Sequence, residues 1–390
     1  FVKRWKVVRH IGNTGTGFSG TLFEAIADNP AAGIKKGQQV LSFRSTEFVD
    51  DAVRDSRATN ELEIKEKGFA FGQISDMKEW IDELRRDGAM KDHITVTGYS
   101  LGGHLATALY QLQSEGTFAG LNIVNTYTFN GAGIGKLLDG AQLKTAIEKF
   151  LHYRKAGAAE LFTTKEAIDL YNEIKEIYDD ESKELADRIS LIKRKVNKTY
   201  MSVKEQHEQV SMNDPAYKAG LKNREEIEYL IEAVKRLDSI NNERLRIRDF
   251  TSGKLDKHPK ETKLLSTEEK DIDGLSLDYQ IGVIISSKKY TEAYPKFLGV
   301  GSGLVRVIMN NKLIEGEKEG KDNFYDIIGK TYTSMVAVSQ KHFGKDIRIS
   351  IEDQPLGRGY FVTNMLKESI LDYKDDTPDL KLLVDKYDIN

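Results

Sequence analysis

A serine with one glycine two residues before it and another two residues after it is the feature of this sequence best suited to covalent chemistry. Gly98, Ser100 and Gly102 lie in the stretch 94–106, which begins with a β-branched run and continues with a helical pattern. A strand-to-helix turn this tight strains the serine backbone, and the small flanking residues prevent clashes. The serine oxygen then stands above the sheet at a helix N-terminus, where developing negative charge is stabilised. We therefore predict that Ser100 is a nucleophile; the alternative is an ordinary strand-to-helix turn.

A second polar segment, residues 43–46 with the sequence Phe-Arg-Ser-Thr, ends a predicted buried strand at 40–43. Here the sequence resembles the class 3 lipases, which place a Phe-Arg-Gly-Ser/Thr segment at the end of an early strand, upstream of the serine elbow. The resemblance implies that Thr46 donates to an oxyanion through its backbone N–H, with its hydroxyl as a further candidate, and that the Leu101 N–H is the other donor. Ser45 stands where the family has glycine, and it would be strained if the position required a positive φ.

Three further segments resemble the bacterial lipases and phospholipases of this group, namely residues 16–23, 68–77 and 128–133. The resemblance is good over residues 14–135 and patchy beyond them. It implies an α/β-hydrolase fold and a serine esterase that degrades lipids as a lipase or phospholipase A.

The acid and base of a triad should follow Ser100 in the family order serine, aspartate, histidine. Residues 244–256 are interpreted as a strand followed by a loop, in which Asp256 is the preferred acid and Asp249, nearer the strand, is the alternative. An ordinary loop carboxylate is an equal alternative for either residue.

Seven histidines are candidates for the base, and five of them fit poorly. They precede the serine, lie on the helix behind it with a structural role, or fall in a helical insertion: His10, His93, His104, His152 and His207. His258 is too close to Asp256 in sequence to pair with it, although it is compatible with Asp249. We therefore predict the triad Ser100, Asp256 and His342, although the resemblance suggests a packing role for His342 as readily as a catalytic one. The resemblance places the base after residues 352–355, where no histidine occurs, so an inactive chain or a base from an unexpected loop are further hypotheses.

The order of the predicted elements indicates an α/β fold with a mainly parallel sheet covered on both faces. A helix at 74–87 ending at Gly88 precedes the strand 94–97, and a helix at 101–112 precedes a strand at 122–129. Together with the resemblance, this predicts an α/β-hydrolase core. Its N-terminal part is residues 1–135, residues 136–243 form a helical insertion, and residues 244–390 complete the core with mixed insertions.

The insertion is predicted from apolar residues at helical spacing. One helix begins behind a capping box formed by Thr163 and Glu166, and another behind Asn223 and Glu226, with a third at 185–203 between them. The amphipathic helices of residues 140–240 are a candidate lid whose apolar face meets lipid, although most such helices pack on a core. Later strands are predicted at residues 244–250, 279–285 and 347–351.

Composition narrows the partners and excludes some chemistry. The 58 basic and 61 acidic residues give a net charge of −3, which favours no nucleic-acid partner, and 39% hydrophobic content supports a buried core. The lack of cysteine excludes disulfides and thiolate sites. No cofactor or metal is predicted, because residues 12–17 lack the lysine of a phosphate loop and residues 271–278 read as a solvated acidic turn rather than a calcium loop.

These observations predict a serine-dependent hydrolase of carboxylic esters, and the resemblance implies that it acts on lipids and makes transient contact with a membrane or lipid-droplet surface. No apolar stretch approaches the roughly 20 residues of a membrane span, and the chain begins at Phe1, so we expect secretion, with the cytoplasm as the alternative. The alternatives in function are a thioesterase or peptidase on the same fold, or a catalytically silent binding protein.

Overall fold

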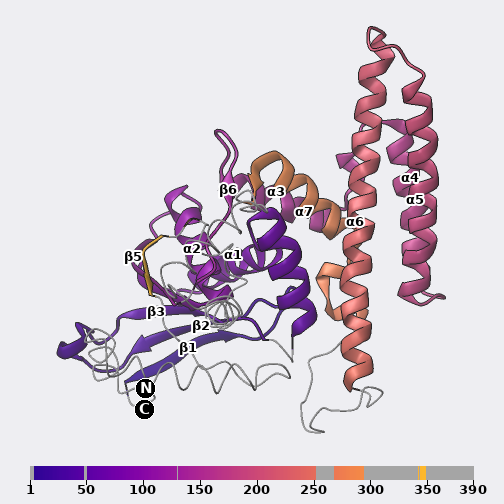
Figure 1. Ribbon diagram of the computed structural model, residues 1–390. Helices are drawn as coiled ribbons and strands as arrows, with labels where there is room; N and C mark the ends of the chain where they lie inside the picture. The colour runs from indigo at the N-terminus through magenta and orange to yellow at the C-terminus, as the bar shows by residue number, and fades with distance from the viewer. Residues whose placement is uncertain are drawn as a thin grey trace, which may run out of the picture.

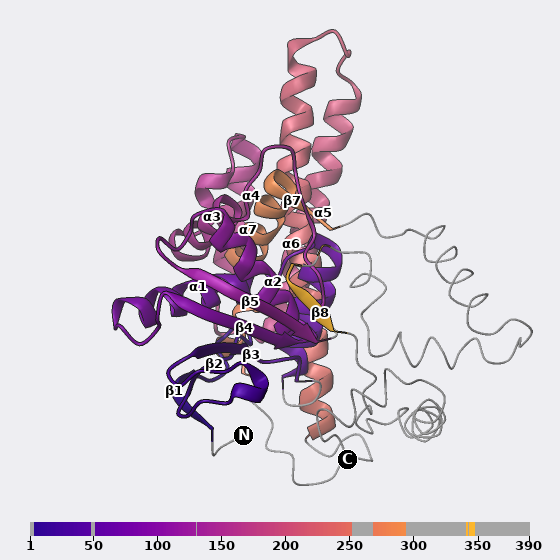
Figure 2. The same ribbon diagram turned by 90° about the vertical axis from the view of Figure 1, so that its left-hand side faces the viewer.

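A six-stranded mixed sheet organises the first third of the chain, in a computed structural model that describes residues 4–47, 51–129, 131–251, 268–293, 341 and 343–347. The strands lie in the order β1 (Trp5–Ile11), β2 (Gly20–Ala25), β3 (Gln39–Phe43), β4 (His93–Tyr99), β5 (Asn122–Phe129) and β8 (Lys345–Ile347) (Figure 2). The first three strands are antiparallel, and β3, β4, β5 and β8 are parallel. The protein is therefore of the mixed α/β class.

The helices α1 (Phe71–Arg86) and α2 (Leu101–Ser114) connect the parallel strands and share one core with the sheet (Figure 1). Because β3, β4 and β5 follow one another across the sheet in one direction, right-handed crossovers put both helices on the same face. On the opposite face Val124 of β5 is 53% exposed. The described helices therefore do not cover both faces of the sheet as the sequence predicted.

Five more α-helices follow: α3 (Leu143–Ala156), α4 (Lys165–Tyr178), α5 (Leu185–Glu208), α6 (Pro215–Thr251) and α7 (Leu277–Tyr290). The helices α5 and α6 form a long hairpin that rises away from the sheet (Figure 1). Small elements complete the described structure: η1 (Pro30–Ala32), η3 (Ala159–Leu161), η4 (Glu269–Asp271), η5 (Asp273–Leu275), β6 (Lys136–Leu137) and β7 (Thr291–Glu292). None of the described helices combines the length and hydrophobicity that a membrane span requires.

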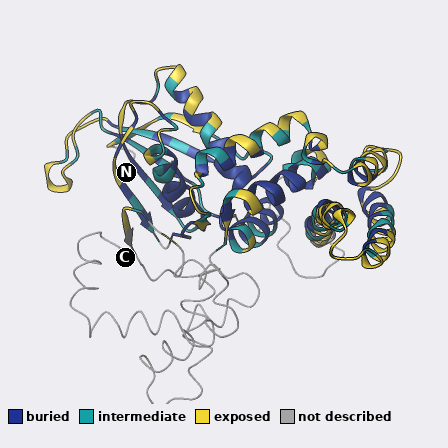
Figure 3. Ribbon diagram, turned by 90° about the horizontal axis from the view of Figure 1, so that it is seen from above, coloured by how far each residue is buried: buried dark blue, intermediate teal, exposed yellow. Residues whose placement is uncertain are grey.

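A second hydrophobic core lies among α4, α5, α6 and α7 and the π-helix η2 (Ala52–Lys65). Figure 3 shows buried residues where these helices face one another and exposed residues on their outer sides. The helix α7 contributes to both cores, with Tyr279 and Val283 facing the sheet region and Ile281 and Ile284 facing the second core. Residues 279–287 of α7 are buried without a break, which explains why this apolar sequence suggested a strand at 279–285.

Two of the predicted later strands are wrong, and the third is partly described. Residues 244–250 continue α6, and residues 279–285 lie within α7. The strand predicted at 347–351 coincides with β8 at Ile347, and its remainder lies outside the described residues.

The capping boxes predicted at two helix starts are also wrong. The helix α4 has Thr164 as its N-cap without a bond from that side chain to the helix, and Asn223 and Glu226 lie inside α6 rather than before it. The Glu226 carboxylate instead accepts the backbone N–H groups of Thr163 and Thr164 at 3.0 and 2.9 Å and both hydroxyls. A residue of α6 thus satisfies the start of α4 across the helix interface.

Candidate active site

Ser100 occupies a strained turn between β4 and α2. Its backbone has φ 50° and ψ −113°, and among the described residues it is the one non-glycine residue with a positive φ. The Ser100 N–H donates to the Phe129 carbonyl of β5 at 3.0 Å. The Ser100 carbonyl accepts from the N–H groups of Gly103, His104 and Ala132 at 3.0 to 3.2 Å. These four hydrogen bonds over-determine the conformation and offset its strain.

Three glycines make this turn sterically feasible. A Cβ on Gly98 would overlap the Gly102 carbonyl, and a Cβ on Gly102 would overlap the Phe43 carbonyl of β3. A Cβ on Gly103 would lie 2.5 Å from the Gly131 Cα. The backbone of α2 therefore approaches β3, β4 and the chain beyond β5 more closely than any side chain permits.

The segment after β3 lies beside this turn. Phe43 is aligned with Gly98 in the parallel register, so Thr46 and Ser100 emerge two to three residues beyond a common level on strands that lie about 4.8 Å apart. Leu101 is the first residue of α2, and its N–H is at the same edge. The structure thus places Ser100, Thr46 and Leu101 at one edge of the sheet. Ser45 does not have a positive φ, so the departure from glycine causes no strain of that kind.

A buried polar cluster that the sequence did not predict supports this segment. The Glu47 N–H donates to Asp55 at 2.9 Å, and the Gln73 amide donates to the other Asp55 oxygen at 2.7 Å. Arg44 lies 3.6 Å from Asp55 and 3.8 Å from Asp51. Burial raises the pKa of both aspartates, and repulsion from Asp51 raises the pKa of Asp55 further. The spacing of four residues between Asp51 and Asp55 was the available signal in the sequence. It is not distinctive, because charged residues on exposed helix surfaces often have the same spacing.

His104 has a structural place, as the sequence predicted. The side chain is completely buried one turn into α2, and the Ala70 N–H donates to its Nε2 at 3.1 Å. Its Nδ1 is 2.8 Å from the Gly133 carbonyl and donates to it. Both ring nitrogens are engaged away from Ser100, so His104 is not a candidate base.

The other described histidines lie on other elements or at the far end of β4. His93 begins β4, at the opposite end of the strand, and His10 on β1 contacts the Thr21 hydroxyl. His152 on α3 contacts Glu160, and His207 on α5 contacts the Tyr217 carbonyl.

Of the four residues predicted as candidate acid or base, one is corrected by the structure and three lie outside the described residues. Asp249 was predicted near the end of a strand, and it lies in α6 instead. Asp256, His258 and His342 lie outside the described residues.

The acidic stretch 271–278 is not the solvated turn predicted from sequence. Asp273 forms an ion pair with Arg154, and Asp278 accepts the Ala158 N–H at 3.0 Å and the Tyr171 hydroxyl at 2.6 Å. These carboxylates connect helices of the fold. Across the described ranges, acidic and histidine side chains form no group of three that could hold a metal ion.

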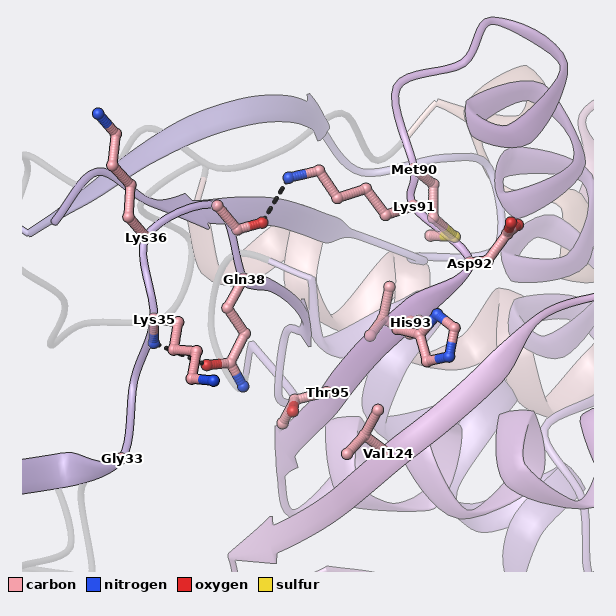
Figure 4. Close-up of a pocket in the computed structure, with 12 residues that line it drawn as sticks. Gly33, Lys35, Lys36, Gln38, Met90, Lys91, Asp92, His93, Thr95 and Val124 are labelled. Carbon is pink, nitrogen blue, oxygen red and sulfur yellow. Dashed lines mark hydrogen bonds between the residues drawn. The ribbon is translucent and has the colours of Figure 1, made fainter. Parts of the chain in front are cut away.

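An open pocket of about 730 Å³ lies at the amino ends of β3 and β4, away from Ser100. Figure 4 shows Lys91 of its wall donating to a backbone carbonyl, that of Gly37, while the Lys35 N–H donates to the Gln38 side chain. Since Ser100 follows the carboxyl end of β4, this pocket is separate from the candidate active site.

Comparison of the chain with models of protein families, with curated proteins and with solved structures found no match. The case for a function therefore depends on the geometry at Ser100.

Proposed function

We propose that this protein is a serine-dependent carboxylic ester hydrolase with an α/β-hydrolase core, acting on lipid esters as a lipase or phospholipase A. The observation that carries the proposal is the strained backbone of Ser100 at the carboxyl end of a central parallel strand, with φ 50° held by four hydrogen bonds. A non-glycine residue in such a conformation is favoured where strain serves function. The lipid substrate follows from the sequence resemblance alone.

The reaction proceeds in two steps. Ser100 Oγ attacks the ester carbonyl while the base takes its proton, and the Thr46 and Leu101 N–H groups donate to the resulting oxyanion. The alcohol leaves, and water then releases the acyl group from Ser100. His342 is the proposed base, with Asp256 as its acid. His258 is the alternative base, and Asp256 is too close to it in sequence to serve as its acid.

The helices of residues 140–240, called here the helical region, are proposed as the lid over this edge. The π-helix η2 touches both parts, because Asn60 binds Thr46 while Ala58 and Leu62 belong to the second core. Lys67 and Glu232 form an ion pair between the chain after η2 and α6. A maleimide bridge between Lys67→Cys and Glu232→Cys should abolish attack on aggregated lipid and spare short soluble esters. Equal loss on both substrates would reject the lid.

The function is tested by fatty-acid release from p-nitrophenyl esters and phosphatidylcholine vesicles. We expect release by the native chain, its loss in Ser100→Ala, and full retention in Ser114→Ala, a serine exposed at the end of the same helix. Subsequent loss in His342→Ala but not His258→Ala would assign the base. A folded chain that releases nothing would overturn the proposal in favour of a silent binding protein.

A further inference from the structure

Asn60 makes a direct contact with the side chain of Thr46, the residue whose N–H is one of the proposed oxyanion donors. Its side-chain Nδ2 donates to Thr46 Oγ1 at 2.9 Å. Both residues are buried, each with 9% of its surface exposed, so water competes little for this bond. The bond connects η2 to the segment that leaves β3 beside Ser100.

The direction of this hydrogen bond determines what the Thr46 hydroxyl can do. A hydroxyl has one proton and two acceptor lone pairs, and Asn60 occupies a lone pair. The hydroxyl proton is then directed to another acceptor, and accepting a bond strengthens the one it donates. A hydroxyl held in this way is a pre-oriented donor, which is the property that an oxyanion requires.

The backbone around Thr46 is fixed independently of Asn60. The next N–H, that of Glu47, donates to Asp55 at 2.9 Å, and the carbonyls of Phe43 and Arg44 pack against Gly102. Removing the Asn60 amide should therefore change the orientation of the hydroxyl more than the path of the chain.

We propose that Asn60 is a positioning residue that turns the Thr46 hydroxyl toward the oxyanion formed on the substrate of Ser100. This inference rests on the proposed function. Asn60 acts through Thr46 and does not itself touch the substrate.

The test uses Asn60→Asp. A carboxylate only accepts hydrogen bonds, so it would accept one from the Thr46 hydroxyl and turn that hydroxyl away from the oxyanion. We expect kcat on a short p-nitrophenyl ester to fall about tenfold with KM unchanged, since one donor is weakened only in the transition state. As the pH falls from 8 to 5, the new carboxyl becomes protonated, and the ratio of variant to native kcat should rise. Asn60→Ala should lose a similar amount of kcat without the rise at low pH.

A second background separates positioning from a structural role. In Thr46→Val, which lacks the hydroxyl, Asn60→Asp should change kcat less than about twofold, because the two changes remove the same interaction. The same loss in both backgrounds, or a ratio that does not vary with pH, would overturn the inference while leaving the proposed function intact. A native chain that folds but releases no ester product would remove the proposed function and this inference with it.

Discussion

The edge of the sheet around Ser100 and the helical region beyond it are stabilised by different kinds of contact. At the edge, backbone approaches backbone so closely that Gly98, Gly102 and Gly103 admit no side chain. In the helical region, buried charged side chains cross between elements, as Glu226 does to the start of α4 and Arg236 of α6 to Gln280 of α7. An added methyl group at these glycines should disrupt the edge. Loss of one side-chain bridge should lower the free energy of unfolding of the helical region only in part.

Gly98→Ala should produce the largest effect. The added Cβ would overlap the backbone of Gly102, so we expect a loss of unfolding free energy of about 3 kcal/mol or more, together with loss of ester hydrolysis. Denaturant unfolding measures the loss. Gly12→Ala is the matched control, because its Cβ would meet nothing within 4 Å, and it should stay within about 0.5 kcal/mol of the native chain. Equal stability of the two variants would refute the close packing of the edge.

Glu226→Ala should rank second. The carboxylate accepts bonds from the backbone and hydroxyl groups of Thr163 and Thr164, and its removal leaves these two residues, which lead into α4, without that partner. We expect a loss of about 2 to 3 kcal/mol by the same unfolding assay. Glu205→Ala, at an exposed position on α5, is the control and should change little. If Glu226→Ala lost no more unfolding free energy than Glu205→Ala, side-chain bridges would not be what stabilises the helical region.

The pH dependence of stability should come next, through Glu63. This carboxyl is fully buried, accepts the Tyr279 hydroxyl at 2.7 Å, and has its pKa raised by burial from 4.5 to about 7. Between these pH values the folded state holds more protons than the unfolded state. The contribution of Glu63 to the free energy of unfolding is therefore fully present below pH 4.5 and is lost as the pH rises through 7. We expect a decline of about 1 to 3 kcal/mol between pH 5 and 8.

Glu63→Gln should reduce this slope, because an amide keeps hydrogen-bonding capacity and does not ionise. The slope should not vanish, since burial also raises the pKa of Asp55 and its contribution has the same sign. Unfolding measured at pH 5, 6, 7 and 8 gives the comparison. A slope identical to that of the native chain would show that Glu63 does not ionise in this range.

The smallest effects are expected at the tip of the α5–α6 hairpin. Met201, Met212 and Leu221 are 51%, 79% and 45% exposed there. Met212→Ser should leave the free energy of unfolding within about 0.5 kcal/mol of native, because little apolar surface is buried at that position. A larger loss, measured at dilute protein concentration, would show that the tip is a packed part of the fold.

The sequence predicted the surroundings of Ser100 well because simple patterns dominate there. The β-branched run before Gly98 became β4, the small-residue helix became α2, and the run ending at Phe43 became β3. The choice of Thr46 and Leu101 came from the family resemblance, and the parallel register of β3 and β4 places both residues at the same edge as Ser100.

The rest of the fold depends on partners distant in sequence. Glu226 resembles a local cap and serves another helix instead, and the apolar residues of α7 fit a strand as well as a buried helix. The polar stretch that forms η2 buries Asp55 and Glu63, which hydrophobic patterning cannot reveal. No local sequence pattern places the acid and the base that we propose for Ser100.

Covalent labelling with a fluorophosphonate probe is the sharpest test of whether Ser100 is an activated nucleophile. We predict that mass spectrometry of the labelled protein will locate the phosphonyl group on Ser100, that Ser100→Ala will lose the label, and that Ser114→Ala will keep it. A folded native chain that takes up no label, or equal labelling of the native chain and Ser100→Ala, would show that Ser100 is not an activated nucleophile.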